Sequence, residues 1–262
     1  MSAADEIKAL TEALAHERQA RQEAEAAVDE ARRARQQFVS LVTHELRVPM
    51  TSIKGYTDLL LKGMMGPLNE AQTNFLQTVR SNVERMSRMV ADLSDINKLE
   101  AQAMQFTPSA VIFNDALNEA LHVLASAIVE KHQSFVRDIP ATLPTLWCDR
   151  VRLVQVLVNL LSNAHLYTPE GGVITVTAEP VTADAESVRI AVGDNGIGIL
   201  PEEQNRIFEA FFRASDEETR QIPGNGLALH LSKRLVEQQG GRIWFESERG
   251  RGSTFYIQFP LA

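Results

Sequence analysis

The sequence predicts an α-helical hairpin that forms a dimeric four-helix bundle, followed by an α/β sandwich with a mixed, largely antiparallel sheet. Three observations support this fold class. No proline or glycine precedes Pro49, apolar residues recur in heptads between residues 68 and 99, and alternating strand-like segments dominate after residue 170. Together these patterns place helices first and a sandwich of about 155 residues after them.

Composition excludes several classes of protein. The chain has 262 residues, of which 44% are hydrophobic, and a formal net charge of −8, whereas a general nucleic-acid binder needs a basic face. A single cysteine, Cys148, excludes an internal disulfide framework and fits a reducing compartment. No apolar run approaches the roughly 18 residues of a membrane span, and the N-terminus lacks an apolar signal core. We therefore expect a cytoplasmic protein, or the cytoplasmic part of a larger one, with no membrane span in this chain.

Residues 1–36 are rich in strong helix formers, so one long helix is expected from near the start to beyond His44. The few apolar residues of this part are Ile7, Leu10, Leu14 and Val28. Arg21 and Arg35 interrupt the heptad column of three of them. The pattern is compatible both with a weak parallel coiled coil and with a solvated single helix, acting as an N-terminal signalling helix.

Residues 37–103 show a tighter pattern. One apolar stripe consists of Phe38, Val42, Leu46, Pro49, Ile53, Tyr56 and Leu60. GMMGP at 63–67 breaks the helix, and a second helix is predicted from about Leu68 to Leu99. Its two heptad columns are Leu76, Val83 and Val90, and Val79, Met86 and Leu93. Because one hairpin cannot bury all of these seams, we expect a homodimer.

The pattern changes in residues 104–262, where helices and strands are both predicted. FTPSA at 106–110 is typical of a linker and helix start, and a helix is predicted from about Val111 to His132. Asp149 is a plausible N-cap for a helix that ends at Leu166. The other predicted elements are short strands around 134–138, an antiparallel hairpin from 172–180 and 187–194, a helix near Gly226 and a closing hairpin from 242–260.

His44 is the first candidate for chemistry. At roughly 100° per residue, His44 lies opposite the centre of the apolar stripe and should point outward. Pro49 has no N–H to donate to the carbonyl of Glu45, which loosens the helix one turn below the histidine. An exposed imidazole beside the Glu45 carboxylate is a usable nucleophile, since the carboxylate can accept its proton. Most helix histidines are structural, so spacing leaves both interpretations open.

Three glycine clusters indicate a second site. They are DNGIGI at 194–199, GNGLAL at 224–229 and GRGS at 250–253. Each is typical of a turn when taken singly, but together they permit close backbone approach to a ligand, and the second opens a predicted helix that can receive phosphate oxygens. The Walker pattern and the protein-kinase His-Arg-Asp motif are both missing from the sequence.

Two amides stand on an apolar helix upstream of these clusters. Asn159 and Asn163 are spaced i, i+4 within VNLLSNAHLYTP at 158–169, so they share one face. Burying such a pair without partners is costly. A metal–phosphate group would be a suitable partner, and hydrogen bonding within a core is the alternative.

Five segments, in order, resemble the motifs of two-component sensor histidine kinases. They are FVSLVTHELRVPM (phosphoacceptor box), VNLLSNAHLYTP (asparagine box), DNGIGI (first glycine box), RIFEAFFR (phenylalanine box) and GNGLAL (second glycine box). The resemblance extends from about Gln37 to Pro260. It implies a dimerisation and histidine-phosphotransfer domain at 37–103 and a catalytic ATP-binding domain at 104–262, of the gyrase, Hsp90, histidine kinase and MutL type.

The resemblance also implies roles. His44 would accept the γ-phosphoryl group of ATP, with Glu45 as its acid–base partner. Asn163 would ligate Mg²⁺ between the phosphates, Asn159 would lie near the same phosphates, and Tyr167 against the base. The phosphoryl group would then pass to an aspartate on the receiver domain of a response regulator.

In the same resemblance, Asp194 would receive the adenine amino group and Arg213 would meet the γ-phosphate, with residues 214–225 as a mobile lid. The other ATP-binding residues implied are Gly196, Gly198, Ile199, Gly224, Gly226 and Leu227.

Three positions depart from the family pattern. Val48 replaces a threonine or asparagine thought to position water for dephosphorylating the partner, so weak or absent phosphatase activity is predicted. Leu166 replaces a lysine near the phosphates, for which Lys233 or Arg213 would have to compensate. Ala228 replaces a glycine, which a helix accommodates easily. A non-catalytic nucleotide-binding scaffold is the main alternative, and an ATPase of the same superfamily would leave the histidine box unexplained.

Overall fold

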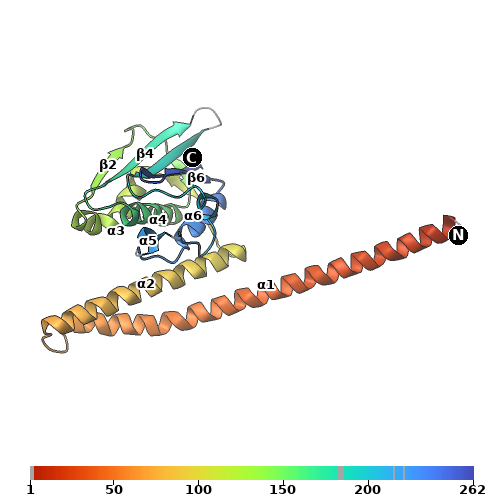
Figure 1. The fold of residues 1–262 in the computed structure, drawn as a ribbon, viewed down its shortest axis with the longest axis horizontal. Coiled ribbons are helices and arrows are strands. Elements are labelled where there is room, and N and C mark those ends of the chain that lie inside the picture. Colours follow the sequence, from red (N-terminus) through yellow and green to blue (C-terminus); the bar gives the residue numbers. More distant parts are fainter. Residues whose placement is uncertain (1–2, 182–185, 215, 221) are drawn as a thin grey trace. The chain divides into compact units, whose positions relative to one another are not determined.

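The computed structural model describes residues 3–181, 186–214, 216–220 and 222–262. The chain divides into two compact units, Met1–Asn97 and Lys98–Ala262. Figure 1 shows a pair of long helices in the first unit and a layered α/β arrangement in the second.

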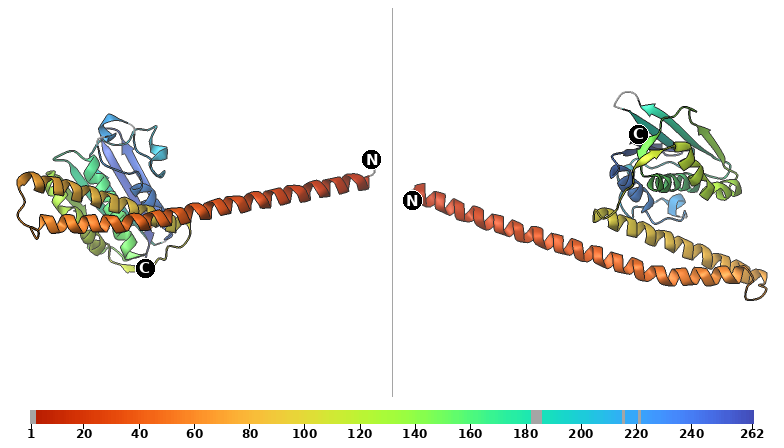
Figure 2. Two further views of the ribbon diagram at one scale, coloured as in Figure 1. Left: turned by 90° about the horizontal axis from the view of Figure 1, so that it is seen from below. Right: turned by 180° about the vertical axis from the view of Figure 1, so that it is seen from behind.

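The first unit is the predicted helical hairpin. Helix α1 (Ala3–Leu61) is continuous through Pro49, and helix α2 (Glu70–Glu100) runs back alongside it (Figures 1 and 2). Gly63 and Gly66 in the connection have positive φ angles of 71° and 116°, which ends α1. Asn69 and Gln72 form a reciprocal cap at the start of α2, with bonds of 2.8 and 2.9 Å.

The hairpin buries only one of its apolar seams. Thr43, Met50 and Thr57, spaced by seven residues, are buried, and Met50 packs with Val83 and Val90. The predicted column containing Val83 and Val90 therefore faces α1. Several residues of the predicted stripe and of the second column remain exposed, namely Phe38, Leu46, Ile53, Tyr56, Val79 and Met86. Only part of the stripe is buried, because a single hairpin covers only the residues, spaced by seven, that face the partner helix.

The second unit contains a five-stranded sheet of order β2-β4-β5-β7-β6. Its strands are β2 (Ser134–Asp138), β4 (Val173–Val181), β5 (Ser187–Asp194), β6 (Arg242–Glu248) and β7 (Gly252–Pro260). Strand β2 pairs parallel with β4, and every other pair is antiparallel. Both predicted hairpins and the mixed sheet are confirmed.

Helices cover one face of this sheet. They are α3 (Phe113–Glu130), α4 (Arg150–Tyr167) and α6 (Ala228–Glu237) (Figure 1). The buried layer between sheet and helices includes Leu117, Leu157, Leu160, Leu161, Ile174, Ile190, Leu231, Ile257 and Phe259. Two short elements, η1 (Gln204–Arg206) and α5 (Glu217–Arg220), lie between β5 and α6 in the chain.

One predicted helix boundary is wrong. The helix expected from Val111 begins at Phe113, because Ser109–Val111 forms strand β1, which pairs antiparallel with β3 (Leu146–Cys148). Val111 and Cys148 are buried by this pairing. Strands of three residues carry too little alternation to be detected in a sequence.

The N-cap predicted at Asp149 is confirmed. Its Oδ1 accepts hydrogen bonds from the N–H groups of Val151 (2.9 Å) and Arg152 (3.2 Å). Its Oδ2 accepts from the Thr107 N–H at 2.9 Å, and its own N–H donates to Gln239 at 2.7 Å. The start of α4 is therefore tied to two other segments of the second unit.

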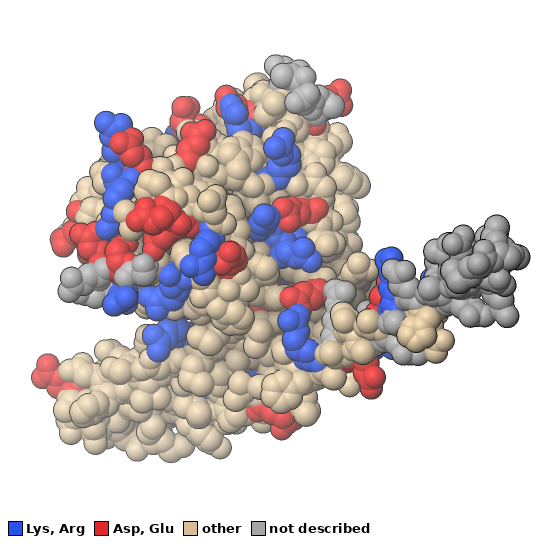
Figure 3. Space-filling view, turned by 45° about the vertical axis from the view of Figure 1, so that its right-hand side comes forward, with Lys and Arg blue, Asp and Glu red and all other residues tan. Residues whose placement is uncertain are grey.

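Charged side chains of both signs are interspersed over the second unit on the face that Figure 3 shows. Such a surface differs from the basic face that a phosphate backbone requires. Within the described ranges, no helix combines the length and the apolar character needed to cross a bilayer.

Candidate active site

His44 lies on the outer side of α1, as its helical phase predicts. Its side chain is 70% exposed, and its Nδ1 lies 3.3 Å from Glu45 Oε1. Its neighbour Thr43 is buried, so the helix presents the histidine away from the hairpin core. Val48 follows one turn later and is 60% exposed. The imidazole is thus accessible and has a carboxylate as its hydrogen-bond partner.

A separate cavity lies in the second unit, below the end of β5. Its volume is about 100 Å³. Six of the residues implied by the resemblance line it: Asn163, Tyr167, Asp194, Gly198, Ile199 and Arg213. The sequence separates these residues by up to 50 positions, and the fold brings them together from α4, β5 and the two loops before α6.

Asp194 is the most perturbed acid of this cavity. Its Oδ1 accepts a hydrogen bond from the Gly196 N–H at 2.9 Å. Burial raises the pKa of Asp194 to about 6, although backbone hydrogen bonds from Gly196 and Ser253 oppose the rise. A partly buried carboxyl facing a cavity suits a ligand group that donates a hydrogen bond.

The glycines of the first box are required by close backbone contacts. A Cβ at Gly196 would lie 2.2 Å from the carbonyl oxygen of Tyr167. Gly198 has a φ of +67°, and a Cβ there would lie 2.1 Å from the Glu248 carbonyl oxygen. The loop is therefore pressed between the end of α4 and the β6–β7 turn, and no larger residue fits without displacing backbone.

The two asparagines have different surroundings. Asn163 lines the cavity, whereas the Nδ2 of Asn159 donates to the Ala228 carbonyl at 3.3 Å and to Ser232 Oγ at 3.2 Å. Asn159 thus braces α4 against α6, which is the core role that the sequence left open for this pair. Asn159 is not among the residues that line the cavity.

The residues of the second glycine box also differ in their surroundings. Gly226 has a φ of +70° and a Cβ there would lie 2.4 Å from the Phe212 carbonyl oxygen, whereas a Cβ at Gly224 would meet open space. Leu227 is 1% exposed, so its side chain belongs to the core rather than to a ligand surface. None of these three is among the residues that line the cavity.

Arg213 lines the cavity, but its guanidinium is turned toward the lid. Its Nη2 donates to the carbonyl oxygens of Thr219 (3.4 Å), Arg220 (3.5 Å) and Ile222 (2.6 Å). Positions 215 and 221 of the predicted lid fall outside the described residues. These bonds hold the guanidinium against carbonyl groups of the predicted lid.

Arg249, which directly precedes GRGS, was given no role by the sequence. Its guanidinium pairs with Glu218 at 2.8 Å and Asp216 at 3.6 Å, and donates to the carbonyls of Ile197 and Gly198 at 3.4 Å. One side chain therefore joins the lid to the first glycine loop. The glycine cluster around it was the available signal, but its partners are distant in sequence.

The two cations expected to compensate for Leu166, Lys233 and Arg213, have other partners in this structure. Lys233 Nζ lies 5.3 Å from the centre of the Phe208 ring and 3.8 Å from Glu237. Arg213 is engaged by the lid, as described above. Lys131 donates from its Nζ to the Leu166 carbonyl at 3.2 Å.

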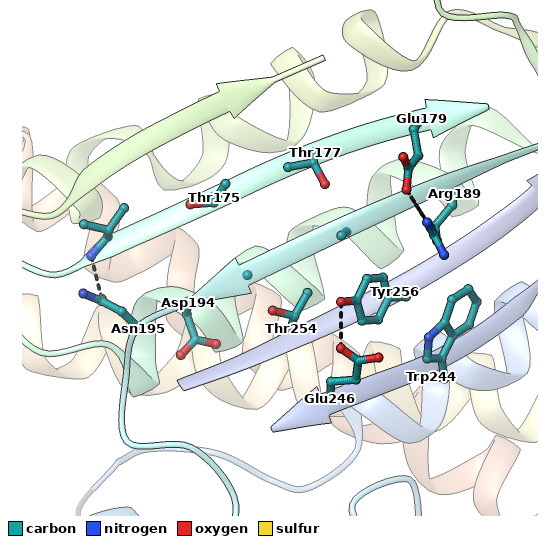
Figure 4. A pocket seen from close by; sticks show the side chains of 13 residues that line it. Thr175, Thr177, Glu179, Arg189, Asp194, Asn195, Trp244, Glu246, Thr254 and Tyr256 are labelled. Carbon is teal, nitrogen blue, oxygen red and sulfur yellow. Dashed lines mark hydrogen bonds and ion pairs between the residues drawn. The ribbon is translucent and has the colours of Figure 1, made fainter. Parts of the chain in front are cut away.

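A larger hollow, of about 520 Å³, lies on the face of the sheet that carries no helix. Figure 4 shows its threonines, the Glu179–Arg189 pair and the aromatic residues Trp244 and Tyr256. Asp194 is the only implied site residue among those that line it. The hollow is shallow and polar, as an exposed sheet face usually is. The smaller cavity is therefore the better candidate site.

Comparisons with known proteins agree with this geometry. Residues 34–102 match the His Kinase A (phospho-acceptor) domain, and residues 148–262 match the histidine kinase-, DNA gyrase B-, and HSP90-like ATPase domain. The adaptive-response sensory kinase SasA of Synechococcus elongatus is 33% identical over 232 residues, covering 86% of this chain and 59% of SasA. The sensor histidine kinase WalK of Bacillus subtilis is also 33% identical, covering 86% of this chain and 36% of WalK. The chain thus spans only part of the length of these relatives.

Solved structures show the same fold. Full-length ShkA in complex with AMPPNP superposes with a TM-score of 0.71 at 27% identity, covering 86% of this chain and 46% of ShkA. ThkA in complex with the response regulator TrrA superposes with a TM-score of 0.57 at 23% identity, covering 86% of this chain and 61% of ThkA. With both domains matched and the five boxes in order, this chain belongs to the two-component sensor histidine kinases and carries their phosphoacceptor and ATP-binding domains.

Proposed function

We propose that this chain is the catalytic core of a sensor histidine kinase. It transfers the γ-phosphoryl group of ATP to His44, and from there to an aspartate of a response regulator. The observation that carries this proposal is the convergence of six implied nucleotide-binding residues on one cavity. An exposed histidine with an adjacent carboxylate supplies the acceptor.

Glu45 prepares His44 for attack. A carboxylate at Nδ1 favours the tautomer that carries its proton on Nδ1, which leaves the lone pair of Nε2 available. Nε2 then forms the new N–P bond while the bond between the γ-phosphorus and its bridging oxygen breaks, and ADP leaves. The Nδ1 proton passes to Glu45, so the phosphohistidine is left neutral at its ring.

Asn163 would hold Mg²⁺ through its amide oxygen, which is a hard ligand of the kind that Mg²⁺ prefers. The ion, when bound, neutralises phosphate charge. Asp194 offers an acceptor for the adenine amino group, and the tightly packed glycines let the backbone approach the nucleotide. Positioning and charge neutralisation are sufficient for phosphoryl transfer.

The chain acts as a homodimer in this proposal. Exposed apolar residues on both helices, such as Ile53 and Met86, form the seams that a second hairpin would cover. ThkA has been crystallised with a response regulator, which supports a receiver domain as the partner of this chain too.

Labelling with γ-³²P-ATP tests the proposal. The wild-type chain is expected to acquire acid-labile, base-stable label, and His44→Gln is expected to acquire none, because no other side chain occupies the acceptor position. His16→Gln removes another exposed histidine of α1 and should label like wild type. Label retained in His44→Gln would refute the assignment, and ATP binding without any label would favour the non-catalytic scaffold.

Val48 gives a second prediction, that this kinase is a poor phosphatase. Its exposed side chain, one turn from His44, offers no hydrogen-bond donor or acceptor to a water molecule. Decay of a phosphorylated regulator in the presence of this chain and ADP is expected at the spontaneous rate. Val48→Thr is expected to accelerate that decay roughly tenfold or more, by supplying a hydroxyl that orients water.

The matched control is Val48→Ala, which also changes the side chain but adds no polar group, and should leave decay unchanged. Both variants should still label at His44. Rapid decay with the unmodified chain would show that Val48 does not limit the phosphatase reaction.

A further inference from the structure

The last turn of α4 is capped by a segment far away in sequence. Carbonyl groups at a helix end have no partner within the helix. Lys131, which follows α3, donates from Nζ to the carbonyls of His165 (2.9 Å) and Leu166 (3.2 Å). One ammonium group thus satisfies two terminal carbonyls and places a positive charge at the negative end of the helix dipole.

Gln133 completes this cap. Its Nε2 donates to the carbonyls of His165 (3.1 Å), Thr168 (2.9 Å) and Pro169 (3.3 Å), and the residue is buried. A buried amide that serves three carbonyls must keep its NH₂ group turned toward them.

His165 fixes that orientation. Its Nδ1 lies 2.7 Å from Gln133 Oε1, and because an amide oxygen only accepts, the ring must carry a proton on Nδ1. Burial, and next the nearby charge of Lys131, lower the pKa of His165, which keeps the ring neutral. The histidine therefore holds the glutamine, and the glutamine holds the helix end.

The capped turn carries two of the residues proposed to bind ATP. Asn163 and Tyr167 line the cavity from this end of α4. The Tyr167 carbonyl also accepts from the Ile197 N–H at 3.2 Å, and Gly196 packs against it. A shift of this turn would displace both the asparagine box and the first glycine box.

We propose that Lys131, Gln133 and His165 are positioning residues for ATP. They lie outside the lining of the cavity and act through the last turn of α4, so they set the affinity for ATP and not the rate of phosphoryl transfer. This inference rests on the proposed ATP site.

His165→Leu tests it. The substitution removes the donor that orients Gln133 and puts an apolar side chain of similar size in its place. The Kd for ATP, measured by calorimetry on the full chain, and the KM in autophosphorylation are expected to rise about fivefold to tenfold, with kcat within about twofold of wild type.

Two controls separate positioning from general damage. His165→Asn keeps an N–H donor near the Nδ1 position and is expected to restore the wild-type Kd. His122→Leu removes an exposed histidine of α3 and should change nothing. A melting temperature lowered in His165→Leu with an unchanged Kd would overturn the proposal, because the cap would then be only structural.

Lys131→Met serves if His165→Leu does not fold, since Lys131 is only partly buried. It retains the aliphatic stem, removes the cation and is expected to raise the Kd for ATP about threefold or more. An unchanged Kd in this folded variant would equally overturn the proposal. If the wild-type chain itself bound no ATP, the proposed function would fail instead, so the two failures are distinguishable.

Discussion

Asparagine in place of Asp194 is expected to weaken ATP binding about tenfold or more. The Oδ1 of Asp194 accepts from the Gly196 N–H, and an asparagine oxygen can keep that hydrogen bond. Its NH₂ group then stands where the second carboxylate oxygen was, and it faces the cavity as a donor. An adenine amino group is also a donor and finds no acceptor. Calorimetric titration of the full chain with ATP measures the loss.

The same substitution is expected to stabilise the fold at pH 8. Burial raises the pKa of Asp194 from its ordinary 3.8 to about 6, so the folded state binds this proton more tightly than the unfolded state does. Above pH 6 the carboxyl is charged in both states, and the free energy of unfolding is lower by roughly 1–3 kcal/mol. That penalty fades as the pH falls from 6 to 3.8. Asparagine is uncharged and avoids this penalty, although its NH₂ group cannot accept from the Ser253 N–H as a carboxylate oxygen does. Urea unfolding should therefore show a net gain at pH 8 and none at pH 4.

The wild-type chain provides an internal check on this acid. A protonated Asp194 presents a weaker acceptor, so ATP affinity is expected to fall as the pH drops through about 6. Asp194→Asn should show no such dependence. A wild-type affinity that stays flat between pH 5 and 8 would contradict the role of this carboxylate.

Alanine at Gly226 is the second substitution with a large expected effect. Gly226 has a φ of +70°, and its carbonyl accepts from the Phe211 N–H at 2.9 Å, which ties the two ends of the lid together. A methyl group would lie 2.4 Å from the Phe212 carbonyl oxygen. The free energy of unfolding is expected to fall by about 2–4 kcal/mol. ATP affinity is expected to fall about tenfold, because this hydrogen bond no longer holds the two ends of the lid together.

Gly224→Ala is the matched control from the same glycine box. A Cβ there meets nothing within 4 Å, so the free energy of unfolding should stay within about 0.5 kcal/mol of wild type. Urea unfolding of both variants, followed by ATP titration, gives the comparison. Equal stability of the two variants would show that the backbone around Gly226 relaxes freely.

Long elements with a regular apolar pattern were predictable from the sequence. Helix α2 keeps its heptads over 31 residues, and β4 and β5 alternate clearly, so each pattern outweighs local exceptions. Strands β1 and β3 have three residues each and were missed. The split of the apolar stripe on α1 was also missed, because a stripe does not reveal which part a single partner helix covers.

Six of the expected ATP-binding residues gather at one cavity, but the surroundings of each residue could not be predicted. Asn159 and Asn163 are both asparagines, one helical turn apart. Only the position of α6 makes Asn159 a core residue and leaves Asn163 at the cavity. The contacts of Arg249 and the cap at Lys131 join residues about 30 or more positions apart. Such pairs carry no periodic signal, since they depend on how completed elements pack.

Helix α4 is fastened at both ends, by Asp149 at its start and by Lys131 and Gln133 at its finish. The length of the helix, 18 residues, is therefore fixed by the distance between these two caps. One inserted residue would lengthen the helix by about 1.5 Å and rotate all later side chains by about 100°, which would turn Asn163 away from the cavity. Four inserted residues would bring the side chains back to within about 40° of their direction, but would move the capped end of the helix by about 6 Å. Across related chains, the composition of this helix can drift, whereas deletions and insertions within it should be absent.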